Sequence, residues 1–216
     1  MSKVVAIDGP AGAGKSTVAR LLAERCGFTY VNTGSLYRAI AWAAAGKGVD
    51  IKDLQDDFLS GLDLDYVDGK LLVNGVDPGE ELRSTACSAV ASLIATQPRV
   101  RQFLLPVQRN AAMKGWIVME GRDIGSVIFP DAAYKFFVTA SVEERARRRL
   151  EQNANETLTF EEIKKLISER DYQDSHRSEA PLRQAEDAVL VDTSKMSIDE
   201  VVTYLCDYIS KNPVEC

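Results

Sequence analysis

A segment near the amino terminus has the residue types and spacing needed to bind phosphate. Gly9-Pro10-Ala11-Gly12-Ala13-Gly14-Lys15-Ser16-Thr17 fits the pattern Gly-x4-Gly-Lys-Ser/Thr and directly follows the apolar run 4–7. In this pattern the glycines allow backbone N–H groups to converge on phosphate oxygens, the lysine adds a positive charge, and the Ser16 hydroxyl can bind Mg²⁺. A chance glycine-rich turn would not need the strand before it or the helical pattern that continues at 17–25. The segment therefore predicts a site for a nucleoside triphosphate.

Two arginines that follow predicted strands indicate a second anion site. Arg38 comes after the apolar run 28–31, and Arg122 comes after the run 116–119. In open parallel sheets, ligands bind beyond the carboxyl ends of the strands, where the phosphate loop also lies. Either arginine alone could equally be a solvated surface charge. Their shared position after core strands favours a common pocket.

A dense basic run offers further candidates for contacts to a migrating phosphoryl group: Arg145, Arg147, Arg148 and Arg149. Positions 145, 148 and 149 share one helical face. Guanidinium groups can stabilise the charge of a phosphoryl group in transfer through bidentate hydrogen bonds, and we single out Arg145 and Arg148 for this role. An ordinary solvated face is an equal alternative, because Glu143, Glu144 and Glu151 lie close enough in the sequence to pair with the arginines.

A second cluster of charges contains Arg170, Asp171, Asp174 and Arg177, of which 170, 174 and 177 share a helical face. The cluster could be a ladder of ion pairs along the helix. Exposed pairs of that kind stabilise a protein by only about 0.3 to 0.5 kcal/mol each, so a role in binding sugar and phosphate is at least as well supported. We expect His176 to be a surface residue.

The elements that must position these residues are strands alternating with helices. Apolar, β-rich runs occur at 4–7, 28–31, 116–119, 134–138 and 189–191, mostly separated by helical patterns, which predicts a parallel sheet flanked by helices. Three helix starts have the spacing of a capping box, in which a hydroxyl and an acid three residues later satisfy free N–H groups. These pairs are Ser141 with Glu144, Thr159 with Glu162, and Ser197 with Glu200.

The section 62–78 departs from this pattern. Short alternating runs are joined at Asp68-Gly69 and Asn74-Gly75, which predicts a three-stranded antiparallel meander, with a helix after it at 84–95. We therefore predict an insertion at 63–95 in a core formed by 1–62 and 96–216. A polar break at 153–155 could belong to a mobile lid at about 145–160 over the phosphate site, or be an ordinary loop.

The composition excludes several classes of protein. The chain has 216 residues, 45% of them hydrophobic, which is enough for a core without disulfides. A formal charge of −6 argues against a general nucleic-acid surface, and the four cysteines are too far apart in sequence for a metal or disulfide framework. The apolar runs are too short for a signal peptide or a membrane span. We expect a cytoplasmic monomer.

Several segments, in order, resemble the bacterial cytidylate kinases. They are Ile-Asp-Gly-Pro-Ala-Gly-Ala-Gly-Lys-Ser-Thr (7–17), Thr-Gly-Ser-Leu-Tyr-Arg (33–38), Gln-Pro-Arg-Val-Arg (97–101), Gly-Arg-Asp-Ile-Gly-Ser-Val-Ile-Phe-Pro-Asp-Ala (121–132) and Arg-Asp-x3-Ser-x-Arg-x3-Ala-Pro-Leu (170–182). The resemblance covers almost the whole chain, and the segment 121–132 is far more specific than the phosphate loop. It implies a P-loop nucleoside-monophosphate kinase: an α/β fold with a five-stranded parallel sheet, a helical lid and an enlarged monophosphate-binding insertion.

The resemblance also implies roles for individual residues. Arg38, Arg122 and Arg177 would bind the acceptor's phosphate, Tyr37, Arg170 and Asp174 would lie near the ribose with Thr33 in the same pocket, and Ser92, Arg101 and Asp123 would read cytosine. A carboxylate accepts a hydrogen bond from the cytosine amino group but repels the uracil carbonyl at that position. Glu120 and Asn32 stand where members of the family often have Asp, so the geometry of a magnesium-bound water at position 120 is open.

The implied reaction is transfer of a phosphoryl group from ATP, with Mg²⁺, to CMP and dCMP. Another small-molecule P-loop kinase, such as a dephospho-coenzyme A or dTMP kinase, is an alternative. A nucleotide-dependent switch that hydrolyses slowly is another, but it would have no second phosphate pocket.

Overall fold

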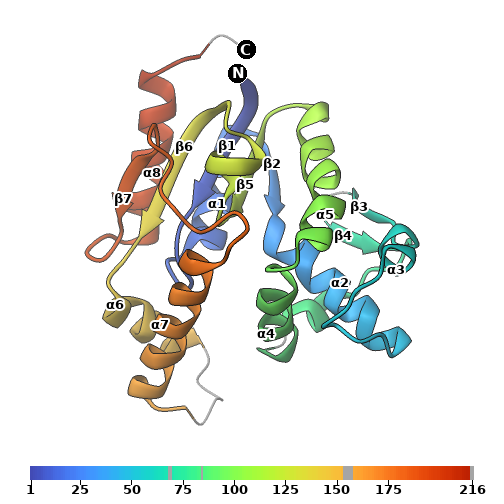
Figure 1. Ribbon diagram of the computed structural model, residues 1–216. Coiled ribbons are helices and arrows are strands. Elements are labelled where there is room, and N and C mark those ends of the chain that lie inside the picture. Colours follow the sequence, from blue (N-terminus) through green and yellow to red (C-terminus); the bar gives the residue numbers. More distant parts are fainter. Residues whose placement is uncertain (68–69, 84, 153–157, 215–216) are drawn as a thin grey trace. The chain divides into compact units, whose positions relative to one another are not determined.

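The protein is described here from a computed structural model that covers residues 1–67, 70–83, 85–152 and 158–214 (Figure 1). The chain divides into two compact units. The first contains residues 1–30 and 116–216, and the second contains residues 31–115. The predicted insertion at 63–95 falls within the second unit, which also includes the helices on either side of it.

The elements follow one another in an order that alternates strands and helices in the first unit. In chain order they are β1 (Ser2–Asp8), α1 (Lys15–Cys26), β2 (Thr29–Asn32), α2 (Thr33–Lys47), α3 (Asp56–Ser60), β3 (Leu64–Val67), β4 (Lys70–Val73), η1 (Gly79–Arg83), α4 (Thr85–Ile94), α5 (Pro98–Ala111), η2 (Ala112–Lys114), β5 (Ile117–Gly121), η3 (Ile124–Ile128), β6 (Ala132–Thr139), α6 (Val142–Gln152), α7 (Phe160–His176), β7 (Val189–Asp192) and α8 (Ile198–Lys211).

The main sheet has five strands in the order β2-β5-β1-β6-β7, which confirms the predicted fold class. Strand β1 pairs in parallel with both β5 and β6 and is buried from Val4 to Asp8, as a continuous apolar run predicts for a central parallel strand. Asp8 lies opposite Gly121 in the register, so β1 and β5 end at the same level. The phosphate loop and Arg122 therefore leave the sheet from the same edge.

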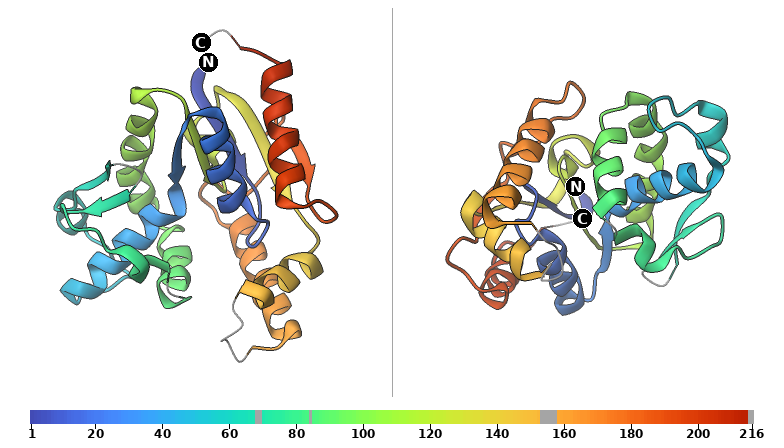
Figure 2. Two further views of the ribbon diagram at one scale, coloured as in Figure 1. Left: turned by 180° about the vertical axis from the view of Figure 1, so that it is seen from behind. Right: turned by 90° about the horizontal axis from the view of Figure 1, so that it is seen from below.

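Helices α1 and α8 pack together on one face of this sheet, in front of the strands in the left view of Figure 2. Their apolar faces join the strands in one cluster that includes Leu22, Phe136 and Leu205. Burying side chains of this size stabilises the fold by roughly 1.5 to 3 kcal/mol each. The core thereby fixes where β1 ends and α1 begins.

Helices α6 and α7 pack against each other around Ala146, Ile163 and Ile167. The predicted capping boxes at Thr159 and Ser197 are confirmed with both hydrogen bonds. At Ser141 only the hydroxyl part is present, since Glu144 directs its carboxylate to Arg147 and Arg148 instead. The core of the predicted lid, residues 153–157, lies outside the described residues.

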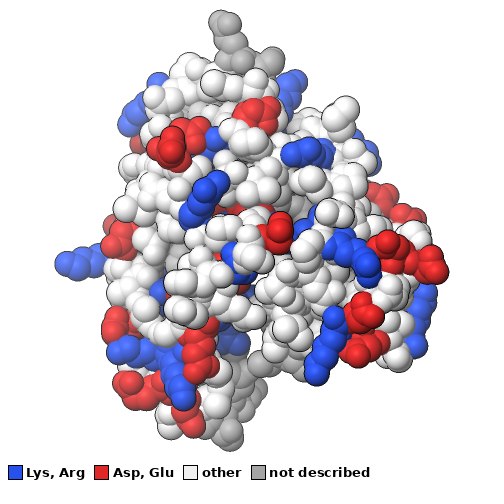
Figure 3. Space-filling view, in the orientation of Figure 1, with Lys and Arg blue, Asp and Glu red and all other residues white. Residues whose placement is uncertain are grey.

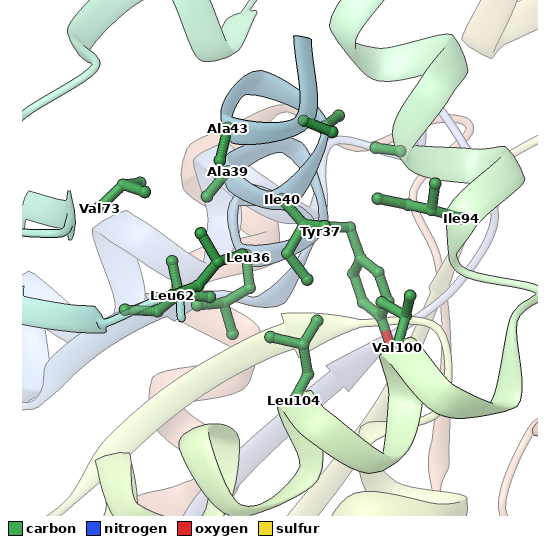
Figure 4. Close-up of a cluster of buried hydrophobic side chains, with 14 of the residues drawn as sticks. Leu36, Tyr37, Ala39, Ile40, Ala43, Leu62, Val73, Ile94, Val100 and Leu104 are labelled. Atoms are coloured by element: carbon green, nitrogen blue, oxygen red, sulfur yellow. The ribbon is translucent and has the colours of Figure 1, made fainter. Parts of the chain in front are cut away.

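The second unit has its own core, formed by α2, α4, α5 and the β3–β4 hairpin. Figure 4 shows Leu36, Ile40, Ile94 and Leu104 of this core converging beside Tyr37. Strands β3 and β4 are antiparallel, but the predicted third strand is wrong: within the described residues, Val76 forms only an isolated bridge to Val73. The tight turn at Asn74-Gly75, with positive φ at both positions, leaves too little chain before Pro78 to extend a third strand. The other predicted turn, Asp68-Gly69, lies outside the described residues.

Candidate functional site

The predicted phosphate loop connects β1 to α1, which is the context that its sequence pattern requires. Gly9 lies so close to β6 that a Cβ on it would come within 1.9 Å of the carbonyl oxygen of Val138, so no other residue fits there. Gly14 precedes α1 with a φ of 83°, in the left-handed region that favours glycine. The start of α1, with Ser16 exposed in its first turn, presents free N–H groups as helix termini do at anion sites.

Lys15 is buried in the first turn of α1, with 5% of its surface exposed, and its Nζ donates a 2.6 Å hydrogen bond to the carbonyl oxygen of Pro10. Burial lowers the pKa of Lys15 well below its usual value, and the positive charges of Arg122 and Arg170 lower it further. Glu120 and Asp174 act in the opposite direction without cancelling the effect. Burial and the two nearby arginines thus both disfavour the charged form of Lys15, and an anionic phosphate group beside it would favour that form.

Arg122 follows β5 and donates from Nε to Oδ2 of Asp174 on α7, at 2.8 Å. Burial by itself would raise the pKa of Asp174, which is 6% exposed, but the charges of Arg122, Arg170 and Arg177 outweigh it and lower the pKa. Asp174 thus lies among three of the arginines that the sequence analysis selected. Asp174 therefore contacts an arginine that follows β5, and not only residues of its own helix. An ion-pair ladder along α7 alone would not include this contact.

Arg177, which ends α7, makes the corresponding contact to Asp123. Its NH2 group donates to Oδ1 of Asp123 at 3.1 Å, and its Nε and NH2 both donate to the carbonyl oxygen of Ala180. Both charged side chains are almost fully buried. Together with Arg122 and Asp174, they form two arginine–carboxylate pairs that join the segment after β5 to the end of α7.

The structure places the two arginines of α6 differently from each other. Arg145 is 4% exposed and donates to the carbonyl oxygens of Ala11 and Ala140 and to Asp171. Arg148 donates to Glu144 and Thr193, and a Cβ on Gly14 would lie 3.7 Å from its guanidinium group. Both therefore lie beside the phosphate loop.

Arg147, on the exposed side of α6, pairs with Glu144 and Glu151, which is the solvated arrangement that the sequence also allowed. Its hydrogen bonds, together with those of Arg148, outweigh partial burial and lower the pKa of Glu144 to about 2.

Five of the predicted CMP-binding residues belong to the second unit: Thr33, Tyr37, Arg38, Ser92 and Arg101. Asn32 caps α2 by accepting a hydrogen bond from the Ser35 N–H, a contact that an Asp at this position could also make. Arg101, on α5, donates to the hydroxyl of Tyr37 at 3.1 Å, which brings two of the five together. Ser92 is half-buried on α4, and Arg38 is half-buried five residues after Thr33 on α2.

Two buried acids lie near the loop: Asp8, which the sequence analysis did not consider, and Glu120, whose role in binding a magnesium-bound water it left open. Asp8 accepts hydrogen bonds from the N–H groups of Ile124 and Gly125, and burial raises its pKa to about 6 despite those bonds. Glu120 accepts a hydrogen bond from the Tyr30 hydroxyl. An isolated acid at the end of an apolar strand was the signal for both. Their oxygens, with the Ser16 hydroxyl, suit a hard cation such as Mg²⁺.

Among the described residues no helix is long and apolar enough to cross a lipid bilayer. Figure 3 shows basic and acidic side chains interspersed over the face that it presents. This distribution fits the net charge of −6 and differs from the continuous basic surface of a general nucleic-acid binder.

Comparison with known proteins gives a consistent result. The family described as cytidylate kinase matches residues 5–211. A cytidylate kinase of Pseudothermotoga lettingae is 45% identical over 205 residues, which are 94% of this chain and 92% of the relative. One from Clostridium botulinum is 41% identical over 212 residues, 96% of this chain and 98% of the relative. The crystal structure of an uncharacterized protein from Eubacterium ventriosum has a similar fold, with a TM-score of 0.53, 13% identity, and coverage of 96% and 98% of the two chains.

Proposed function

The chain belongs to the cytidylate kinase family of nucleoside-monophosphate kinases, and from this premise we propose that it transfers the terminal phosphoryl group of ATP to CMP and to dCMP. The observation that carries the proposal is the buried Lys15 of the phosphate loop, with Arg122 and Arg170 near enough to lower its pKa. A site that only bound a purine base or a sugar would not need this concentration of cations next to a phosphate loop.

The donor is assigned to the loop 9–17. N–H groups of the loop and of the first turn of α1 would bind the phosphates of ATP, with Lys15 moving from the Pro10 carbonyl to a phosphate oxygen. The Ser16 hydroxyl would bind Mg²⁺, and Glu120 would accept a hydrogen bond from a water on the cation. When bound, the cation neutralises charge on the transferring phosphate.

The acceptor is assigned residue by residue from the family motifs. Arg38, Arg122 and Arg177 would bind the phosphate of CMP, and Tyr37, Thr33, Arg170 and Asp174 would bind its sugar. Ser92, Arg101 and Asp123 would read the base. The contacts of Asp174 and Asp123 support this assignment, because they hold Arg122 and Arg177 in fixed positions before any ligand arrives.

The mechanism follows from the charges of the two substrates. The acceptor phosphate oxygen of CMP is already ionised at neutral pH, so no strong general base is required. The protein must bring two polyanions together, stabilise the charge of the phosphoryl group in transfer, and exclude water. Lys15 and the arginines provide the positive charge. Arg148, beside Gly14, is the more accessible of the two candidate arginines on α6, while Arg145 is buried and donates to Ala11, Ala140 and Asp171.

A panel of acceptors tests the proposal. ADP release is measured with ATP and Mg²⁺ in the presence of CMP, dCMP, UMP, dTMP, AMP or dephospho-coenzyme A, and the product is identified by chromatography. We expect CDP and dCDP to form at the highest kcat/KM. Preference for dTMP or dephospho-coenzyme A would assign the chain to another acceptor, and ADP release at the same rate with and without any acceptor would indicate a hydrolytic switch.

We also propose that the enzyme works as a monomer in the cytoplasm.

A further inference from the structure

We propose that Asp171, a residue of α7 to which the family motifs give no ligand, is a positioning residue that holds the phosphate loop in its ATP-binding conformation. The inference rests on the proposed function, since it takes ATP as the ligand of the loop. It concerns a contact inside the first unit, among α6, α7 and the residues between β1 and α1.

The two oxygens of the Asp171 carboxylate have different partners. Oδ1 accepts a hydrogen bond from the N–H of Ala11 at 3.1 Å, and Oδ2 accepts one from NH1 of Arg145 at 2.5 Å. The same Arg145 nitrogen donates to the carbonyl oxygen of Ala11 at 2.9 Å. The ion pair therefore binds both the N–H and the C=O of one residue in the phosphate loop.

Burial makes this arrangement rigid. Arg145 is 4% exposed, and its Nε donates to the carbonyl oxygen of Ala140. The loop also packs directly on the two helices, because a Cβ on Gly12 would lie 3.3 Å from Cβ of Arg145 and 3.8 Å from Cδ1 of Ile167. Charge-assisted hydrogen bonds in such a site are stronger than those between neutral groups. Loss of the carboxylate would leave the buried guanidinium without its counter-charge and the Ala11 N–H without its acceptor.

The position of Asp171 on α7 gives the contact a functional consequence. Arg170 is the preceding residue in the chain, and Asp174, the partner of Arg122, lies about one helical turn after Asp171. One helix thus carries both the group that holds the loop and two of the charged groups that act on Lys15, Arg170 and Asp174. Asp171 thereby fixes the distance between the phosphate loop and the charged side chains of α7. This distance determines whether the loop N–H groups and the arginines can bind the same phosphate groups.

The test compares Asp171→Asn, Asp171→Ala and the wild type, with Glu169→Ala as the matched control. Glu169 is an exposed acid on the same helix whose partner is Lys165. Asparagine keeps an oxygen for the Ala11 N–H but removes the charge that faces Arg145, while alanine removes both contacts. For each protein we would measure the Kd of a fluorescent ATP analogue, the KM for ATP, the KM for CMP at saturating ATP, and the thermal midpoint of unfolding.

We expect Asp171→Ala to raise the Kd and KM for ATP at least ten-fold and Asp171→Asn to raise them about three-fold. The KM for CMP should change less than two-fold in both, and Glu169→Ala should match the wild type throughout. Wild-type affinity for ATP in folded Asp171→Ala would overturn the inference, as would equal losses for ATP and CMP. If alanine prevents folding, Asp171→Asn decides: wild-type Kd and KM for ATP in this variant would overturn it. If instead the wild type failed to bind ATP, the proposed function would be wrong.

Discussion

The buried carboxyl of Asp8 makes the stability of the enzyme depend on pH in a way that can be calculated. Asp8 is 5% exposed at the end of β1, and burial raises its pKa from 3.8 to about 6, even though two N–H groups donate to it. Between these two pH values the folded state binds a proton that the unfolded state has released. The free energy of unfolding therefore falls as the pH rises through this window, and the loss is complete above pH about 6.

The size of the effect follows from the shift. A rise in pKa from 3.8 to about 6 corresponds to about 3 kcal/mol, nearly all of it lost by neutral pH. Other carboxyls, such as Glu144, titrate in the opposite sense, so the wild type alone would not isolate Asp8. The comparison with Asp8→Asn does, because asparagine does not titrate. On lowering the pH from 7 to 4.5, we expect the wild type to gain about 2 kcal/mol relative to Asp8→Asn.

Urea unfolding at pH 4.5, 5.5 and 7 measures this difference directly. Asparagine can accept from only one of the two N–H groups of Ile124 and Gly125, so its free energy of unfolding is lower by a constant amount at every pH. This constant difference does not affect how the free energy of unfolding changes with pH. Asp131→Asn, which removes an exposed acid of the same unit, should follow the wild type at all three values. Parallel curves for the wild type and Asp8→Asn would refute the reasoning, and a gain of the opposite sign would do so more strongly.

The remaining predictions concern the site and the core. Lys15→Ala should reduce kcat with every acceptor nucleotide, and an unchanged kcat would remove the loop from the mechanism. Arg122→Ala should lower kcat/KM for CMP by a factor on the order of 10³. As the control, Arg147→Ala, which replaces an exposed arginine, should keep kcat/KM for CMP within two-fold of the wild-type value. Asp123→Ala should weaken CMP binding and reduce the preference for CMP over UMP in paired kinetic measurements. Leu104→Ala, in the core of the second unit, should lower the free energy of unfolding by roughly 2 to 5 kcal/mol in urea titrations.

The parts of the fold that depend on local signals could be predicted from the sequence. All five core strands lie, within a few residues, where apolar runs predicted them. The signal is clearest for the central strand β1, which is buried continuously from Val4 to Asp8. The phosphate loop and two capping boxes depend on residues within a few positions of one another. The third strand of the meander was wrong because turn residues fix where a chain reverses but not whether the next segment is long enough to pair.

Contacts between distant residues were beyond the sequence patterns. The run of arginines at 145–149 gives no sign that Arg145 turns inward to Asp171 while Arg147 pairs in solvent, because helical spacing defines a face but not what that face packs against. The same holds for Asp8, whose partners are more than 100 positions away. The assignment of residues to CMP binding stays a prediction, both for the residues of the first unit and for those of the second. The contacts of Asp174, Asp123 and Tyr37 support it.

The central claim, phosphoryl transfer from ATP to CMP, is tested most directly by ³¹P nuclear magnetic resonance of the purified protein mixed with ATP, Mg²⁺ and CMP. The account predicts that the resonances of ADP and CDP grow together in equal amounts while the CMP resonance declines. Growth of ADP with inorganic phosphate, while CMP stays constant, would contradict it.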